Sequence, residues 1–348
     1  MTMNQAVPSK PWKQTPRELL YPSILILVCV IVSTFLVKST SLSGKLGFLV
    51  SFFLLSTISL SFYKFRMRGW QAAKDSVASS VMLSAAVAVF VPVASILFST
   101  IEKGVPGLHK TLFTQTMFEA SYMDPVSNGG LLHAIIGTLY LILLTAVISV
   151  PTGILTALYL TEIKGPGARF IQLTVQAMSG VPSVVAGLFI FAAVILTTPI
   201  KPSGIAGAMA LSILMIPTVT RTAQEVLLLI PNDLREAGLA MGATQWKTVS
   251  NIVLPAARNG LLTATILGIA RIAGETAPLI FTIGGSDKLN WNPFVEYQGA
   301  LPFYVWKGLL LGTPESVQRA WTGILVLLIL VLSLFTLARV FGSRKVGK

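Results

Sequence analysis

Residues 131–161 read LLHAIIGTLYLILLTAVISVPTGILTALYLT, a run of 31 residues without Asp, Glu, Lys or Arg. A bilayer core about 30 Å thick is crossed by about 20 apolar helical residues, so this run is long enough to span it. Of the 348 residues in the chain, 53% are hydrophobic and 11% are charged, whereas ordinary soluble domains carry roughly 25% charged residues. We therefore expect an all-α, multi-span protein whose solvent is lipid.

Seven further runs have a similar length and composition. They cover residues 19–37, 46–63, 76–101, 170–200, 202–220, 259–286 and 320–338. The runs 131–161 and 170–200 contain Pro151 and Pro182, where a kink or break in the helix is expected. Among all eight, only 259–286 contains charged residues, Arg271 and Glu275.

The segments between these runs differ in their content of Lys and Arg. If the N-terminus is cytoplasmic, the inner segments carry 17 of the 26 Lys and Arg residues, the outer segments carry 8, and Arg271 is the last. Cytoplasmic segments are enriched in basic residues, so we expect both termini in the cytoplasm. A composition change near residue 75 predicts an N-terminal segment with a two-span hairpin (1–75), a six-span body (76–341) and a cytoplasmic tail (342–348).

The same composition excludes several other classes of protein. The formal net charge of +13 is explained by basic residues beside membrane spans, so nucleic-acid binding is not expected. Cys29 is the only cysteine, which excludes an intramolecular disulfide. His109 and His133 are the only histidines; we interpret them as solvated or interfacial, and expect no metal and no cofactor.

The cytoplasmic loop 222–258 predicts two short helices. Asn232 or Asp233 is placed to cap the first helix, Gly242 to end it, Thr244 to cap the second and Pro255 to stop that one. Three interpretations fit such a pair of helices. It is an amphipathic connector on the membrane surface, a helix-turn-helix motif that binds DNA, or a docking helix for a soluble partner. The DNA reader is disfavoured because both ends of the loop are tethered to the membrane.

Docking would use small residues to let a partner approach the backbone, with charge from Arg235 and Glu236 at the rim. The loop contains Glu236-Ala237-Gly238, then Gly242, then Ile252-Val253-Leu254-Pro255. This pattern resembles the EAA loop of ABC-importer permeases, with Gly238 where the family usually has alanine. The resemblance implies a six-helix permease core, here preceded by the extra hairpin. It also implies that Glu236, Ala237, Gly238, Gly242, Ile252, Leu254 and Pro255 seat a coupling helix on an ATPase subunit.

The charged pair in run 259–286 lies within a predicted span. Arg271 and Glu275 are four residues apart, so on one helix they would share a face about 6 Å apart along the axis. An ionised side chain at the bilayer centre costs on the order of 3 kcal/mol, so both are expected to face protein or water. Two interpretations stay open. The residues form an ion pair that fixes helix packing, or they form a polar station, that is, a position along a transport pathway where a solute binds.

A polar station of this composition suits one class of solute. Arginine presents five fixed donors to an oxyanion, and a nearby glutamate accepts a hydrogen bond from a protonated one. Phosphate carries protons at neutral pH and sulfate does not, so the pair would favour phosphate.

The sequence from Arg271 to Pro278, Arg-Ile-Ala-Gly-Glu-Thr-Ala-Pro, is similar to the signature of PstA-type permeases of phosphate ABC transporters. Residues 180–187, GVPSVVAG, resemble another stretch typical of that subunit, and together the similarities cover roughly residues 75–340. The resemblance implies a phosphate pathway containing Arg271, Glu275 and Thr276. It also implies three partners: a PstC-type second permease, a PstB-type ATPase dimer and an extracytoplasmic PstS-type phosphate-binding protein.

The chain has no Gly-x-x-x-x-Gly-Lys-Ser/Thr sequence to cradle ATP. We therefore expect a transport subunit that is not itself an enzyme and takes its energy from a separate ATPase. A permease for another oxyanion, such as molybdate or sulfate, and an ion-coupled secondary carrier are the alternatives.

Overall fold

The computed structural model describes residues 16–39 and 44–342, and within them the regular secondary structure is helical. The all-α prediction is therefore confirmed. The predicted N-terminal segment up to residue 15 and the tail from residue 343 lie outside the described residues. The chain divides into two units, residues 1–97 and 98–348, which are described separately.

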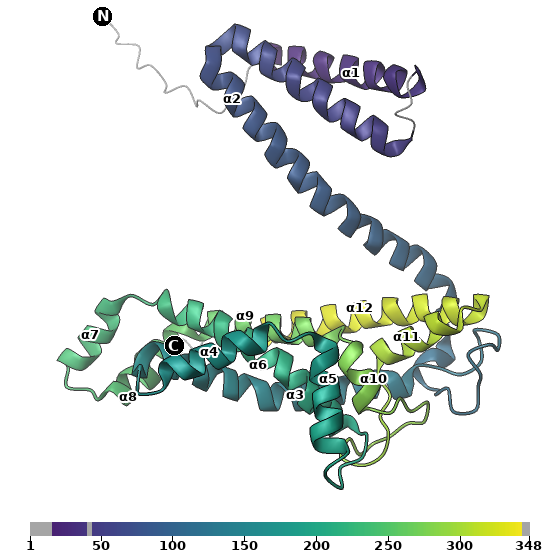
Figure 1. The fold of residues 1–348 in the computed structure, drawn as a ribbon, viewed down its shortest axis with the longest axis vertical. Helices are drawn as coiled ribbons and strands as arrows, with labels where there is room; N and C mark the ends of the chain where they lie inside the picture. Colours follow the sequence, from purple (N-terminus) through teal and green to yellow (C-terminus); the bar gives the residue numbers. More distant parts are fainter. Residues whose placement is uncertain (1–15, 40–43, 343–348) are drawn as a thin grey trace, which may run out of the picture. The chain divides into compact units, whose positions relative to one another are not determined.

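The first unit contains α1 (Pro16–Ser39) and most of α2 (Lys45–Gly104) (Figure 1). Gly69 interrupts α2 with φ +82° and ψ −171°, a conformation that glycine reaches without steric cost. The two predicted runs 46–63 and 76–101 lie on either side of this glycine. Cys29 Sγ on α1 lies 3.7 Å from Ser59 Oγ on α2, and the Tyr21 and Tyr63 rings stack with centroids 6.3 Å apart.

The second unit is a bundle in which α3, α6, α9 and α12 lie lengthwise, with α7 and α8 at one end (Figure 1). Its helices are α3 (Leu132–Leu158), α4 (Ala168–Ser179), α5 (Ser183–Ile190), α6 (Gly204–Leu228), α7 (Asn232–Ala240), α8 (Gln245–Thr248), α9 (Leu254–Ala273), α10 (Ala277–Thr282), α11 (Leu301–Leu311) and α12 (Pro314–Gly342). Short 3-10 turns cover Val105–Gly107 and Lys110–Phe113, and π turns cover Tyr159–Ile163, Phe191–Ile195 and Val249–Val253.

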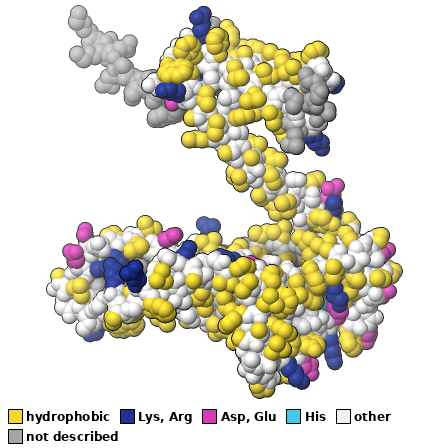
Figure 2. Space-filling view, in the orientation of Figure 1, with side chains coloured by type: hydrophobic (Ala, Val, Ile, Leu, Met, Phe, Trp, Pro, Cys, Tyr) yellow, Lys and Arg dark blue, Asp and Glu magenta, His cyan; other side chains and the backbone are white. Residues whose placement is uncertain are grey.

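Helix α6 lies at the centre of the core. Leu211, Met215, Val219, Ala223 and Leu227 recur every four residues along it, and each is at most 2% exposed. This spacing places them on one helical face, which packs against α3 and α9. Elsewhere hydrophobic side chains cover much of the visible surface, and charged side chains gather mainly toward the ends of the bundle (Figure 2).

The structure modifies the predicted list of spans. Within residues 16–39 and 44–342, six helices are long and apolar enough to cross a membrane, and α2 counts as one of them although it holds two predicted runs. The expected break near Pro182 is confirmed, because α4 and α5 are bent by 106° there. The expected irregularity at Pro151 is not a break, since α3 continues through it. The apolar helix α11 was not predicted.

Pro255 does not stop a helix, contrary to the prediction. It lies in the first turn of α9, directly after the π turn Val249–Val253, and helical structure runs from Gln245 to Ala273. Proline is tolerated in the first turn of an α-helix, and the wider π turn shifts the hydrogen-bond register just before it. The span predicted to begin at Asn259 therefore belongs to a longer helical stretch.

Candidate functional site

Arg271 lies in the last turn of α9 and reaches across to α6. Its Nη1 donates a hydrogen bond to Thr218 Oγ1 at 3.0 Å, and the Thr218 hydroxyl donates to the Leu214 carbonyl at 3.1 Å. The guanidinium is therefore held at one nitrogen by protein, while the Arg271 side chain as a whole is exposed in the isolated chain. Its position also places a cation near the C-terminal carbonyls of α9, where the helix dipole favours it.

Glu275 does not share a helical face with Arg271, contrary to the prediction. Helix α9 ends at Ala273, and Glu275 and Thr276 form the break before α10. Pro278 disfavours continuation of the helix, because it lacks an N–H and its ring would crowd the carbonyl of Gly274. Among the described side chains, no ion pair joins Arg271 to Glu275 within 4 Å, so the packing ion pair is not supported.

The two stretches that resemble permease signatures contact each other. A Cβ added to Gly187 on α5 would lie 2.6 Å from Pro278 Cα and 2.8 Å from the Pro278 carbonyl oxygen. The contact is with backbone, which cannot rotate away, so only glycine permits this approach. The pair fixes α5 against the start of α10, directly after Glu275 and Thr276, both of which are half-buried.

Thr218 was not identified from the sequence, although a pattern pointed to it. On α6, Thr218, Arg221 and Glu225 follow each other at a spacing of three and four residues, from the edge of the buried stripe to the exposed side of the helix. Arg221 and Glu225 are exposed and Thr218 is half-buried. A polar stripe thus continues from the Arg271 contact toward the end of the bundle that carries α7 (Figure 1).

The loop after α6 forms the two predicted short helices, with different caps at its start. Helix α7 begins at Asn232 after Pro231, and its N-cap makes no side-chain hydrogen bond, so the predicted Asn232 or Asp233 cap is wrong. Gly242 ends the helix as predicted, with φ +81°. Thr244 caps α8 as predicted, because its Oγ1 accepts a hydrogen bond from the Lys247 N–H at 3.4 Å.

Arg235 points into the chain. The sequence predicts that it supplies charge at the rim of a docking surface, and the structure does not show this. Its Nε and Nη2 donate to the Glu162 carboxylate at 3.0 Å and 2.8 Å, and its guanidinium also donates to the carbonyls of Leu227 and Ile230 at 2.8 Å and 2.6 Å. The side chains of Arg235 and Glu162 are 19% and 6% exposed. The hydrogen bonds to Glu162 raise the pKa of Arg235 above its ordinary value. Helix α7 is thereby tied to the ends of α3 and α6.

Gly238 also faces the chain. A Cβ added there would lie 2.8 Å from Ile252 Cδ1 and 2.8 Å from Thr248 Cγ2, so alanine at this position would require these two side chains to shift. Gly238 is buried within the chain, and its role in seating the coupling helix on an ATPase subunit stays a prediction.

The other predicted coupling residues are more open. Glu236, Ala237, Gly242 and Pro255 are exposed, and Leu254 is half-buried. Residues available to a partner thus come from only part of the predicted set.

A second polar cluster lies among the loops at the other end of the bundle. The Asp287 carboxylate forms an ion pair with Lys307 and accepts a hydrogen bond from the Tyr122 hydroxyl at 3.1 Å. Burial and the neighbouring carboxylate raise the pKa of Tyr122 well above its ordinary value, so its hydroxyl stays protonated and donates. His133 is 2% exposed and lies 3.9 Å from Asp287; of the two predicted settings, solvated or interfacial, the first is therefore wrong.

Comparison of the sequence with known proteins places the chain in a family. The family described as "Binding-protein-dependent transport system inner membrane component" matches residues 149–347. A phosphate transport system permease protein PstA from Haemophilus influenzae is 40% identical over 263 residues, which are 72% of this chain and 87% of that protein. The PstA protein of Yersinia pestis is 36% identical over 285 residues, 80% of this chain and 94% of that one. PstA 1 of Mycobacterium tuberculosis is 35% identical over 259 residues, which are 74% of this chain and 85% of that protein.

Solved structures give weaker matches. The MetNI methionine ABC transporter in an inward-facing conformation has a TM-score of 0.42 and 22% identity, covering 60% of this chain and 89% of that one. An amino acid ABC transporter with histidines has a TM-score of 0.44 and 18% identity, and the match covers 61% of this chain and 92% of that one. The sequence relatives, with candidate spans throughout both units, identify a multi-pass membrane protein. The chain belongs to the family of inner-membrane components of binding-protein-dependent transport systems.

Proposed function

We propose that this chain is the permease subunit of an ATP-driven importer that moves inorganic phosphate into the cytoplasm. The observation that carries the proposal is Arg271, a guanidinium on an apolar helix that is anchored at one nitrogen by Thr218 and otherwise exposed. Relatives that are 35–40% identical are named phosphate transport permeases. A buried or membrane-embedded arginine is costly, so its retention indicates a task.

The chemistry of this station suits a small tetrahedral oxyanion. Nη1 is oriented by Thr218, which leaves the other guanidinium donors for an anion. Glu275 and Thr276 lie in the break that follows and supply a hydrogen-bond acceptor and a hydroxyl close by in sequence. A protonated phosphate can donate to a carboxylate, whereas sulfate would leave that acceptor unpaired.

Energy and partners follow from the family. We assign ATP hydrolysis to a separate PstB-type dimer, which α7 would contact through Glu236, Ala237 and the Gly242 turn, while Gly238 and Ile252 hold α7 in place. A PstC-type permease would complete the pathway and a PstS-type protein would deliver phosphate. In the proposed topology both termini are cytoplasmic, 1–75 is the extra hairpin segment, 76–341 is the permease domain with its coupling loop 222–258, and 342–348 is a tail.

Uptake of labelled phosphate by vesicles that contain the assembled transporter tests the assignment. Arg271→Gln should lower uptake by about 10- to 100-fold, the loss expected for one charge-assisted contact of about 1.5–3 kcal/mol. Arg258→Gln, a matched loss of an exposed charge on the same helix, should leave uptake unchanged. Normal uptake by the Arg271 variant, or loss of assembly without a separate transport defect, would refute the proposed role.

The alternatives predict different competition and energy dependence. Arsenate should inhibit uptake and sulfate or molybdate should not; the reverse result identifies a permease for another oxyanion. Uptake that continues after ATP depletion would identify an ion-coupled carrier.

A further inference from the structure

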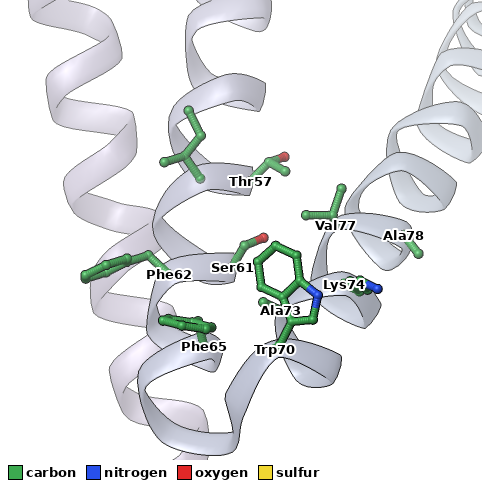
Figure 3. A pocket seen from close by; sticks show the side chains of 10 residues that line it. Thr57, Ser61, Phe62, Phe65, Trp70, Ala73, Lys74, Val77 and Ala78 are labelled. Atoms are coloured by element: carbon green, nitrogen blue, oxygen red, sulfur yellow. The ribbon is translucent and has the colours of Figure 1, made fainter.

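Two of the hollows in the described residues differ in the chemistry of their walls. In the first unit, a hollow of about 640 Å³ between the two parts of α2 is walled mainly by apolar side chains such as Phe62, Phe65 and Trp70 (Figure 3). In the second unit, a hollow of about 380 Å³ lies among the loops at the end of the bundle opposite α7, and charged and polar side chains line it. We call this second hollow the loop pocket. Its wall has the chemistry to recognise a small ion.

Two segments of the chain build the loop pocket, and backbone hydrogen bonds hold them together. One is the loop between α10 and α11, and the other is the segment before α6, which contributes Lys201. The Ser203 N–H donates to the Thr282 carbonyl at 2.9 Å, and the Ile205 N–H donates to the Pro293 carbonyl at 2.8 Å. These bonds fix the backbone next to Lys201 against the loop.

The loop between α10 and α11 is also fixed by contacts of its own. The Asn290 side-chain amide donates to the carbonyls of Val295 and Tyr297 at 2.8 Å and 3.2 Å. The Tyr297 ring packs onto Gly284, which has φ +73°, and an added Cβ there would overlap the ring. The wall of the loop pocket is therefore set by the fold before any ligand binds.

Two ammonium groups of the loop pocket have no acidic partner. Lys201 and Lys288 are exposed, and among the described side chains neither forms an ion pair within 4 Å. The Asp287 carboxylate beside Lys288 is already engaged by Lys307 and by the Tyr122 hydroxyl, so it does not neutralise the pocket. Like charges that share a hollow attract an anion to it, because the wall focuses their field.

The rest of the wall combines further donors with one carboxylate. Trp291 and Tyr297 are 65% and 56% exposed and bring an indole N–H and a phenol O–H to the loop pocket. Glu296 is the carboxylate that lines it, and its backbone is held at φ +66°. Donors beside a single carboxylate suit an oxyanion that still carries a proton, because that proton is donated to the carboxylate.

We propose that the loop pocket is an entry station that binds inorganic phosphate. The proposal rests on the proposed function and adds a second site to it, at the end of the bundle that is extracytoplasmic in the proposed topology. Lys201 and Lys288 attract the anion, and Glu296 accepts a hydrogen bond from its protonated oxygen.

The loop pocket has the same combination of groups as the station at Arg271. In both places basic donors lie near one carboxylate, Glu296 in the loop pocket and Glu275 in the break before α10. Helix α10 connects the two sites along the chain, because it begins directly after that break and ends where the loop begins. Phosphate that enters along this route therefore meets the same selection twice.

Iodide quenching of Trp291 fluorescence measures the site, because Trp291 lines it. The transporter is assembled from both permeases and the ATPase in phosphatidylcholine nanodiscs, without the binding protein. It is titrated with inorganic phosphate near neutral pH at constant ionic strength. The signal of Trp291→Phe is subtracted to remove all other tryptophans. The two lysines should concentrate iodide at Trp291, and phosphate should displace it and lower the quenching, whereas quenching by neutral acrylamide should change less.

Variants of the lining residues make the titration specific. Lys201→Gln combined with Lys288→Gln should raise the phosphate concentration for half-protection by about tenfold, or about threefold for each exposed charge contact. Lys110→Gln, a matched loss of an exposed lysine outside the pocket, should leave it unchanged. In the wild type sulfate should protect Trp291 less well than phosphate, and Glu296→Gln should remove this difference.

Two results would overturn the proposal by removing its specificity. Equal protection by sulfate and phosphate in the wild type would mean that the loop pocket attracts any anion, and protection unchanged by the double lysine variant would mean that phosphate binds elsewhere. Phosphate protection that disappears when phosphatidylglycerol replaces phosphatidylcholine would assign the pocket to a lipid headgroup and would also overturn it. Arg271→Gln should keep the protection while it lowers uptake, so failure of the loop pocket is distinguishable from failure of the proposed function.

Discussion

Replacing Arg235 by methionine should loosen α7 from the rest of the bundle. The change leaves the Glu162 carboxylate, 6% exposed, without its cation and removes the donors to the Leu227 and Ile230 carbonyls. Removing one partner of a buried ion pair costs about 3–5 kcal/mol. Because Arg235 is itself 19% exposed, water compensates part of the loss, and we expect about 3 kcal/mol at most for the docking of α7.

Hydrogen exchange of the amides in residues 232–243 measures this docking directly. A loss of about 3 kcal/mol corresponds to roughly 100-fold faster exchange, if α7 exchanges through local opening. The peptides of α11 and α12 should keep their rates, since neither helix contributes to the contact. Phosphate uptake should fall while basal ATP hydrolysis by the partner remains, because α7 is the proposed link between the two subunits.

Two further variants make the test specific. Glu162→Gln combined with Arg235→Met should recover part of the protection, because the uncompensated charge is gone. Arg258→Met removes an exposed basic residue from α9 and should not change exchange in α7. Exchange of 232–243 within twofold of wild type in the Arg235 variant would refute the role assigned to this ion pair.

Three other substitutions test close contacts. Gly238→Ala should destabilise the loop by about 1–3 kcal/mol because its Cβ would crowd the buried Thr248 side chain, whose Cγ2 would lie 2.8 Å away. A lowered midpoint for loss of α7 protection would show it, and unchanged protection would contradict it. Gly187→Ala should abolish transport or assembly because its Cβ meets the Pro278 backbone at 2.6 Å; normal uptake is the contrary result. Tyr122→Phe should lower stability by about 1 kcal/mol, read as a lower Tm in detergent, and an unchanged Tm would contradict the hydrogen bond to its carboxylate partner.

The apolar runs predicted most of the helices because the length of an apolar run, which must match the bilayer thickness, can be read from the local sequence. The run 19–37 falls within α1 and all but the first two residues of 202–220 fall within α6, and the break at Pro182 was expected from proline chemistry. The helix α11 was missed because its 11 residues are too few to span a bilayer and its position depends on packing. Pro255 was misjudged because a π turn, which sequence rules do not reveal, precedes it.

The sequence predicted which residues belong to the candidate sites, but not which way their side chains face. Arg235 and Gly238 were assigned to an outer docking surface. In the structure, however, Arg235 faces Glu162 and Gly238 faces Ile252, both within the chain. Their spacing on α7 is the same in either case, because periodicity tells which residues share a face and not what that face contacts. Thr218 was missed for a similar reason, since its contact with Arg271 joins residues that are 53 positions apart.

The exposure of Arg271 constrains the assembly as well as the substrate. Ionised arginine within the hydrocarbon layer costs about 2.5–3.5 kcal/mol on insertion scales, and the one hydrogen bond that Arg271 donates to Thr218 recovers about 1.5–3 kcal/mol at best. The remaining donors of the guanidinium still need water, an anion or a second protein at that face. A chain alone in lipid would thus leave part of its most costly side chain unsatisfied, whereas a pathway shared with a second permease would hydrate it. The residue that selects the anion would then also favour assembly with the second permease. Arg271→Leu should therefore abolish uptake and also weaken assembly with that partner. Tighter assembly of the Arg271→Leu variant than of the wild type would contradict this coupling.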